Sequence, residues 1–124
     1  MAKLILKEES YRIVGICMNI HRVLGMGLKE INYKDAMEMD FQEATIPYER
    51  EKKYIVRYKD RILKNPYYAD FLVFDSLIIE VKSVSFLTEA HKAQTLSYLA
   101  VSGLRLGLLI NFGERSLSWQ RLVL

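Results

Sequence analysis

The sequence has 124 residues, of which 51% are hydrophobic and 27% are charged. This length suffices for one hydrophobic core, so we expect a single domain covering residues 1–124, and the composition excludes a disordered chain. The single cysteine, Cys17, rules out an internal disulfide and favours a reducing cytoplasm, while two histidines and one cysteine disfavour a structural zinc site. The sequence contains no uncharged apolar run long enough to span a bilayer.

The formal net charge of +3 is too small to indicate a nucleic-acid partner by itself, but the charge is unevenly distributed. Residues 49–64 contain seven basic and three acidic side chains, a local charge of +4 that leaves −1 for the remainder. A basic strip of this kind suits a polyphosphate partner. Its candidate nucleic-acid-binding residues are Lys53, Arg57, Lys59 and Arg61. A solvated hairpin with ordinary surface charges explains the same pattern.

Two helices are expected in the N-terminal third of the chain, over residues 8–24 and 28–42. The second carries Glu30, Tyr33, Met37 and Phe41 at steps of three and four, so these side chains share one face. Glu30 is therefore an acidic residue in an apolar stripe that should face the sheet. Alternatively, it reaches water at the edge of the stripe, or its charge favours the helix dipole.

A strand is expected over residues 47–59, followed by a turn at Lys59-Asp60-Arg61. Residues 67–83 then form two apolar runs around Asp75-Ser76, the pattern of a buried β-hairpin. Thr88 is a suitable N-cap for a helix over residues 89–102, and Gly103 is the residue type favoured just past a helix end. Strands should follow over residues 106–111 and 118–123. This order predicts an α/β fold in which helices cover a mixed sheet.

Three charged residues interrupt the predicted hairpin: Asp70 in the first run, and Glu80 and Lys82 at the end of the second. Charges in such a hydrophobic segment are costly unless they are paired or bind a metal. Glu80 and Lys82 are two residues apart, so they project from the same face of a strand. Two acids and a lysine are components that a metal-dependent phosphodiester hydrolase requires.

The register of the hairpin decides whether the two acids meet. A two-residue turn at Asp75-Ser76 would pair Asp70 with Val81, and Asp70 would then point away from Glu80. A joint metal site requires an odd-numbered loop, or a bulge, that places Asp70 opposite Glu80. We expect one of these.

The spacing of Asp70 from Glu80-Val81-Lys82 resembles the core motif of the PD-(D/E)XK nuclease superfamily. The segment from Gly27 to Tyr33 is similar to the signature of the GxxExxY family, which is placed in that superfamily. The segment from Gln94 to Tyr98 resembles the QxxxY motif of RecB-type nucleases, and the segment from Gly107 to Gly113 resembles the C-terminal end of the family. In two departures, Ala69 replaces the proline before the aspartate, and Lys34 follows Tyr33 where the family often has glutamate.

This resemblance implies a restriction-endonuclease-like α/β core, a mixed β-sheet flanked by α-helices, and a one- or two-metal carboxylate site. The implied metal ligands are Asp70, Glu80, the backbone carbonyl of Val81 and Glu30, with Mg²⁺ as the ion and Mn²⁺ as an alternative. Lys82 would orient or deprotonate the attacking water, while Gln94 and Tyr98 would hold substrate, water or Lys82. The implied activity is phosphodiester hydrolysis, with DNA as the expected substrate.

Simpler interpretations remain for these residues. Lys82 could form an internal salt bridge with Asp70 or Glu80, although this leaves an excess of buried negative charge. The chain could also be a catalytically silent nucleic-acid-binding or protein-interaction module on a nuclease scaffold, or depend on a partner subunit or a second copy of itself. Cys17 is better explained as a core residue than as a nucleophile.

Overall fold

A computed structural model describes residues 6–124 of the chain, so the first five residues of the expected domain lie outside the described residues. The helices are α1 (Lys7–Leu24), α2 (Glu30–Glu43) and α3 (Glu89–Ser102). The main sheet contains β1 (Tyr48–Tyr54), β4 (Tyr67–Val73), β5 (Leu77–Lys82), β6 (Leu106–Asn111) and β7 (Ser118–Val123). The strands β2 (Arg57–Tyr58) and β3 (Arg61–Ile62) form a separate two-stranded ribbon.

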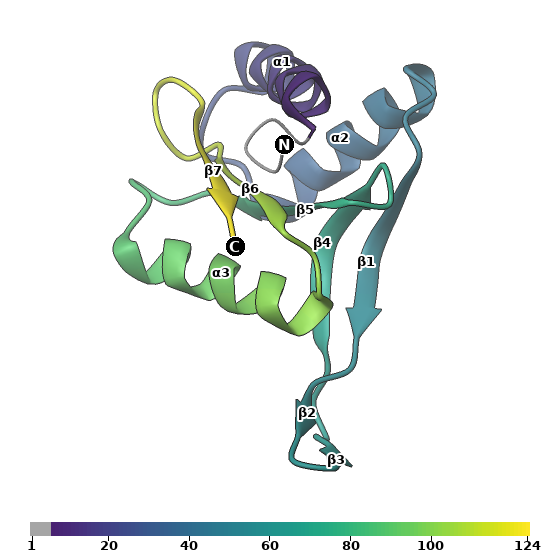
Figure 1. Cartoon of the computed structure of the whole chain (residues 1–124). Coiled ribbons are helices and arrows are strands. Elements are labelled where there is room, and N and C mark those ends of the chain that lie inside the picture. Colours follow the sequence, from purple (N-terminus) through teal and green to yellow (C-terminus); the bar gives the residue numbers. More distant parts are fainter. Residues whose placement is uncertain (1–5) are drawn as a thin grey trace.

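The five strands of the main sheet lie in the order β1-β4-β5-β6-β7 (Figure 1). Strands β5 and β6 are parallel and all other neighbours are antiparallel. A parallel pair requires a crossover connection, which α3 supplies. The predicted α/β fold with a mixed sheet flanked by helices is therefore confirmed.

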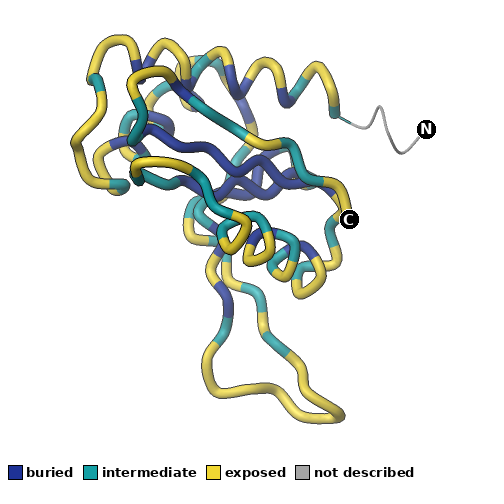
Figure 2. Tube along the Cα trace, turned by 90° about the vertical axis from the view of Figure 1, so that its left-hand side faces the viewer, coloured by how far each residue is buried: buried dark blue, intermediate teal, exposed yellow. Residues whose placement is uncertain are grey.

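The helices cover both faces of the sheet (Figure 1). On one face, α1 and α2 enclose the larger apolar cluster, which includes Met37 and Phe41 of α2 and Ile79 of β5. On the other face, Leu99 of α3 packs against a smaller cluster that includes Ile78. The buried residues are concentrated in the central strands (Figure 2). Among the described residues, no helix is both long enough and apolar enough to cross a membrane.

The strand predicted over residues 47–59 is divided in the structure. Strand β1 ends at Tyr54, where its pairing with β4 ends, and the chain then continues into the β2–β3 ribbon. This ribbon turns at Lys59-Asp60 and projects from the body of the protein (Figures 1 and 2). Its residues are exposed because it has left the main sheet, so the alternation of apolar and charged residues continues there without a core to pack against.

The β4–β5 hairpin has the odd-numbered loop that the sequence analysis required. Pairing runs from Val73↔Leu77 to Phe71↔Ile79, which leaves the three residues 74–76 in the loop. Phe74 and Asp75 adopt positive φ angles of 53° and 56° there. Extension of this register by one pair places Asp70 across from Glu80.

Candidate active site

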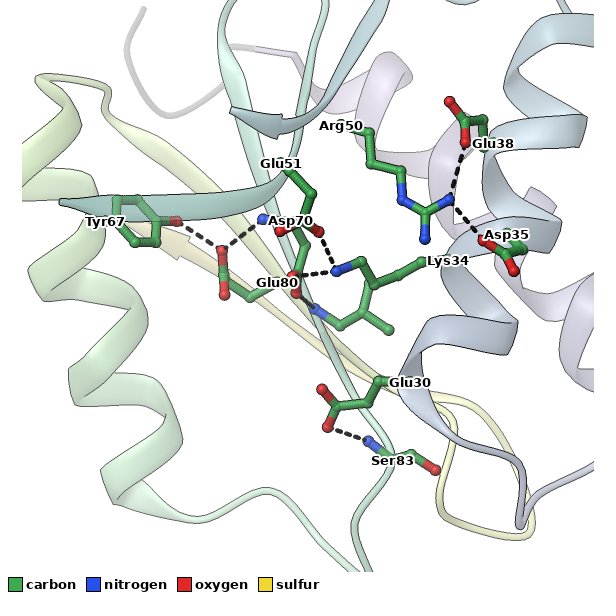
Figure 3. A network of polar contacts seen from close by, with 11 residues as sticks. Glu30, Lys34, Asp35, Glu38, Arg50, Glu51, Tyr67, Asp70, Glu80 and Ser83 are labelled. Carbon is green, nitrogen blue, oxygen red and sulfur yellow. Dashed lines mark hydrogen bonds and ion pairs between the residues drawn. The ribbon is translucent and has the colours of Figure 1, made fainter. Parts of the chain in front are cut away.

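Strands β4 and β5 part at Asp70 and Glu80, and the two acidic side chains take over the hydrogen bonds of the ladder. The backbone N–H of Asp70 donates to Oε2 of Glu80 at 3.3 Å, and the backbone N–H of Val81 donates to Oδ2 of Asp70 at 2.7 Å. Each carboxylate is thus held by the backbone of the opposite strand (Figure 3). These two hydrogen bonds fix the carboxylates of Asp70 and Glu80 next to each other, at the point where β4 and β5 separate.

Glu80 is only 5% exposed, and its carboxylate faces α3. The hydroxyl of Tyr67 donates to Oε2 of Glu80 at 2.6 Å, and the ring of Tyr67 stacks on that of Tyr98 at a centroid distance of 3.9 Å. Burial, together with the negative charge of Asp70, raises the pKa of Glu80 to about 7, although Tyr67, the Asp70 amide and Lys82 oppose this shift. Burial is the larger cause of this shift, and the charge of the neighbouring Asp70 adds to it.

Asp70 also contacts α2. Nζ of Lys34 lies 2.9 Å from Oδ1 of Asp70 and also bonds the carboxylate of Glu51 on β1 (Figure 3). Burial lowers the pKa of Lys34, but its bonds to Glu51 and Asp70 outweigh this and raise the pKa overall. One oxygen of Asp70 thus contacts a lysine and the other contacts the backbone of β5.

Glu30 begins α2 beside the end of β5. Its Oε2 accepts a hydrogen bond from the backbone N–H of Ser83 at 3.2 Å, and the Ser83 hydroxyl donates to the carbonyl of Leu28 at 2.9 Å. Buried Tyr33 donates its hydroxyl to the carbonyl of Gly25 at 2.6 Å, which fixes the connection between α1 and α2. The Gly27–Tyr33 segment therefore places Glu30 next to the strand that carries Glu80 and Lys82, but not on the Asp70–Glu80 pair itself.

Lys82 is the last residue of β5, and the segment after it is tightly fixed. The side-chain amide of Asn111 bonds both the N–H and the carbonyl of Val84, at 3.0 and 2.9 Å. A Cβ atom at Gly113 would collide with the backbone of Ser83 and Val84, so glycine permits this close approach.

Within residues 6–124, no carboxylate lies in ion-pair distance of Lys82. The alternative interpretation, a salt bridge between Lys82 and Asp70 or Glu80, is therefore not supported.

The two residues of the predicted QxxxY motif have different surroundings. Tyr98 is half-buried and reaches the site by stacking on Tyr67, and burial followed by the charges of Glu80 and Asp70 raises its pKa. Gln94 is exposed, and its side chain forms no hydrogen bond within the described part of the chain. The core contacts of α3 come from Thr95 and Leu99 instead, which pack over Gly107 of β6.

The sequence matches the family model described as the PD-(D/E)XK nuclease superfamily over residues 7–122. The chain belongs to this superfamily. Its structure is also similar to one described as "Crystal structure of SSO0001", with a TM-score of 0.59 and 18% sequence identity. That similarity covers 73% of this chain and 47% of the other, so this chain spans about half the length of that protein and shares its fold. A comparison with curated proteins gave no match.

Nucleases of the PD-(D/E)XK superfamily typically use divalent metal ions, which bind oxygen ligands such as carboxylates. Among residues 6–124, no three acidic, histidine or cysteine residues gather closely enough to hold one ion together. Glu30 thus does not complete a three-carboxylate set in this structure. Mg²⁺, however, commonly binds through one or two carboxylates, with water and substrate phosphate as further ligands. Asp70 and Glu80, two carboxylates held next to each other where β4 and β5 separate, fit this pattern.

Three polar residues of the site were not among the predicted site residues: Lys34, Glu51 and Tyr67. Lys34 lies four residues after Glu30, so the helical repeat placed it on the same face as a candidate ligand, and this signal was available. The positions of Glu51 and Tyr67 depend on β1 pairing beside β4 and on the open end of the hairpin. Neither contact has a local sequence pattern.

Proposed function

We propose that this PD-(D/E)XK protein is a Mg²⁺-dependent nuclease of the GxxExxY family that hydrolyses phosphodiester bonds in DNA. The observation that carries the proposal is the parting of β4 and β5, where Asp70 and Glu80 lie across from each other. The adjacent Lys82 has no acidic partner among the described residues. A structural ion pair would be expected to use this lysine, whereas a catalytic site keeps its ammonium available for a reactant.

In this proposal, Asp70 and Glu80 hold the ion together with the backbone carbonyl of Val81, and Glu30 acts through water. The bound ion would activate the attacking water, neutralise the phosphate and stabilise the leaving oxygen. Lys82 orients the water as an ammonium or, after releasing a proton to solvent, accepts the proton of the water as a neutral amine. As an ammonium it also opposes the negative charge that develops on the phosphate. Tyr67 keeps Glu80 oriented through its hydroxyl, and Tyr98 supports the Tyr67 ring.

The test of this function is cleavage of supercoiled plasmid and of single-stranded DNA by the purified protein. We expect cleavage with Mg²⁺ or Mn²⁺ and none in EDTA, with activity restored when the ion is returned. Single-stranded RNA of the same sequence tests the choice of DNA. Binding of DNA without cleavage, under every ion tried, would instead support the catalytically silent module.

The basic strip is proposed to bind the DNA backbone. Lys53 lies on β1 across from Tyr68, while Arg57 and Arg61 extend from the projecting ribbon. The ammonium of Lys59, in the turn, lies 5.3 Å from the centre of the Tyr58 ring. These cationic side chains are exposed and follow one another along β1 and the ribbon that continues from it.

Arg57→Ala is expected to weaken binding to DNA of any sequence and to make it less sensitive to salt. Loss of one phosphate contact should reduce the slope of log affinity against log salt concentration by about 1. Fluorescence anisotropy of a labelled duplex over a KCl series measures both quantities. Arg115→Ala, which removes an exposed arginine far along the chain from the strip, is the matched control. Equal salt slopes for the two variants would exclude the ribbon from the DNA contact.

A further inference from the structure

Lys34 occupies a position that the proposed mechanism does not use. Its Nζ contacts Oδ1 of Asp70 at 2.9 Å, while Oδ2 accepts from the backbone of Val81. The Lys34 side chain is 13% exposed and that of Asp70 is 18% exposed, so water screens this pair only weakly. A divalent ion that binds Asp70 must therefore compete with the ammonium of Lys34, which already bonds the same carboxylate (Figure 3).

Glu51 is the second partner of Lys34, and its backbone is unusual. It lies within β1 but has a φ of 54°, in the left-handed region that non-glycine residues rarely adopt. Its neighbours Arg50 and Lys52 pair with Phe71 and Ala69, whereas no pair forms between Glu51 and Asp70. Such backbone conformations persist only where surrounding contacts impose them, and they cluster at functional sites. Glu51, the residue of β1 with a positive φ, and Asp70, a residue of β4 that has no pairing partner on β1, thus both bond Lys34.

We propose that Lys34 is a tethered cation that competes with the divalent ion for Asp70 and is retained by Glu51 when the ion binds. This inference rests on the proposed metal site. Lys34 neutralises Asp70 in the metal-free protein, where the carboxylate would otherwise repel Glu80. The entering ion takes over that role, and Lys34 keeps its bond to Glu51.

The other acids near Lys34 are already engaged. Asp35 and Glu38, also on α2, both contact Nη1 of Arg50, at 2.7 and 2.9 Å. These bonds connect α2 to β1 independently of Lys34 and leave Glu51 as the acid that can retain the displaced lysine. Loss of Glu51 therefore removes both the alternative partner of Lys34 and one negative charge near the ion.

The two partners of this exchange should change metal affinity in opposite directions. We expect Lys34→Met to bind Mn²⁺ on the order of tenfold more tightly than the wild type, because no cation competes for Asp70. We expect Glu51→Gln to bind Mn²⁺ more weakly. Isothermal titration of the full chain with Mn²⁺ alone, without DNA, measures both effects independently of activity. In thermal unfolding, Lys34→Met should be less stable than the wild type in EDTA, and saturating Mn²⁺ should narrow this difference.

Lys52→Met is the control, since it removes a lysine of the same strand region whose partner is Glu49 rather than Asp70. Its Mn²⁺ affinity should match the wild type. Because the Glu51 side chain is half exposed, Glu51→Gln tests the exchange even if Lys34→Met does not fold.

The outcomes separate this inference from the proposed function. If the wild type binds Mn²⁺ and Asp70→Asn does not, but Lys34→Met binds no more tightly than the wild type, the competition is disproved and the metal site stands. An unchanged affinity in Glu51→Gln disproves the retention of Lys34 by Glu51. If neither the wild type nor Lys34→Met binds Mn²⁺, both the metal site and the competition are excluded.

Discussion

Asp70→Asn and Lys82→Met are each expected to reduce Mg²⁺-dependent cleavage of DNA by at least about 100-fold. Asparagine keeps the shape of Asp70, and its amide oxygen can still accept from the N–H of Val81, but it lacks the charge that an ion requires. Methionine keeps the length of Lys82 without its ammonium. The initial rate of plasmid nicking, measured at saturating Mg²⁺, gives the loss for each variant.

The controls for these variants separate chemistry from folding and from contamination. Circular dichroism and thermal unfolding should show folded protein in both cases, since neither side chain contributes to an apolar cluster. Arg115→Ala, which lies outside the basic strip and is purified in the same way, should cleave at the wild-type rate. Equal residual cleavage in Asp70→Asn, Lys82→Met and the wild type would mean that a contaminating nuclease causes the activity.

The C-terminal half of the fold was predictable because its signals are local. Helix α3 begins after Thr88, whose hydroxyl accepts from the N–H of His91, and it ends at Gly103 with a φ of 75°. Both features follow from residue type at one position, and the predicted bounds of α3, β6 and β7 are confirmed. The odd-numbered loop of the β4–β5 hairpin is also confirmed, since it followed from counting residues between two acids that had to meet.

The predictions that failed, or were not made, concern contacts between distant segments. The strand over residues 47–59 was wrong in its extent, because the end of β1 is set by where β4 begins rather than by its own alternation. Lys34 was recognised only as a departure from the family pattern, whereas in the structure it contacts Asp70, 36 residues later in the chain. Its position depends on the packing of α2 beside β1 and on the positive φ of Glu51. The helical repeat places Lys34 on the face of Glu30, but no pattern within one element shows which residues of β1 and β4 it contacts.

Glu80→Gln is expected to abolish binding of Mn²⁺ and to raise the free energy of unfolding of the metal-free protein. The pKa of Glu80 rises from its ordinary value of 4.5 to about 7 in the folded protein because of burial and the charge of Asp70. Between these pH values the folded protein keeps a proton that the unfolded chain has lost, so the free energy of unfolding of the wild type falls as pH rises. Glutamine carries no such charge, and it can still accept from Tyr67 and the amide of Asp70.

Urea unfolding in EDTA over pH 4 to 8 measures this effect. The wild type should lose stability through the window from 4.5 to about 7, whereas Glu80→Gln should not, and by pH 8 the variant should be more stable by on the order of 2 kcal/mol. Glu38→Gln is a control of opposite sign, because hydrogen bonds from Tyr48 and Arg50 lower the pKa of Glu38. That variant should be less stable than the wild type at neutral pH, and the difference should fade in acid. If the free energy of unfolding of Glu80→Gln fell with rising pH as that of the wild type does, a group other than Glu80 would be responsible for the pH dependence.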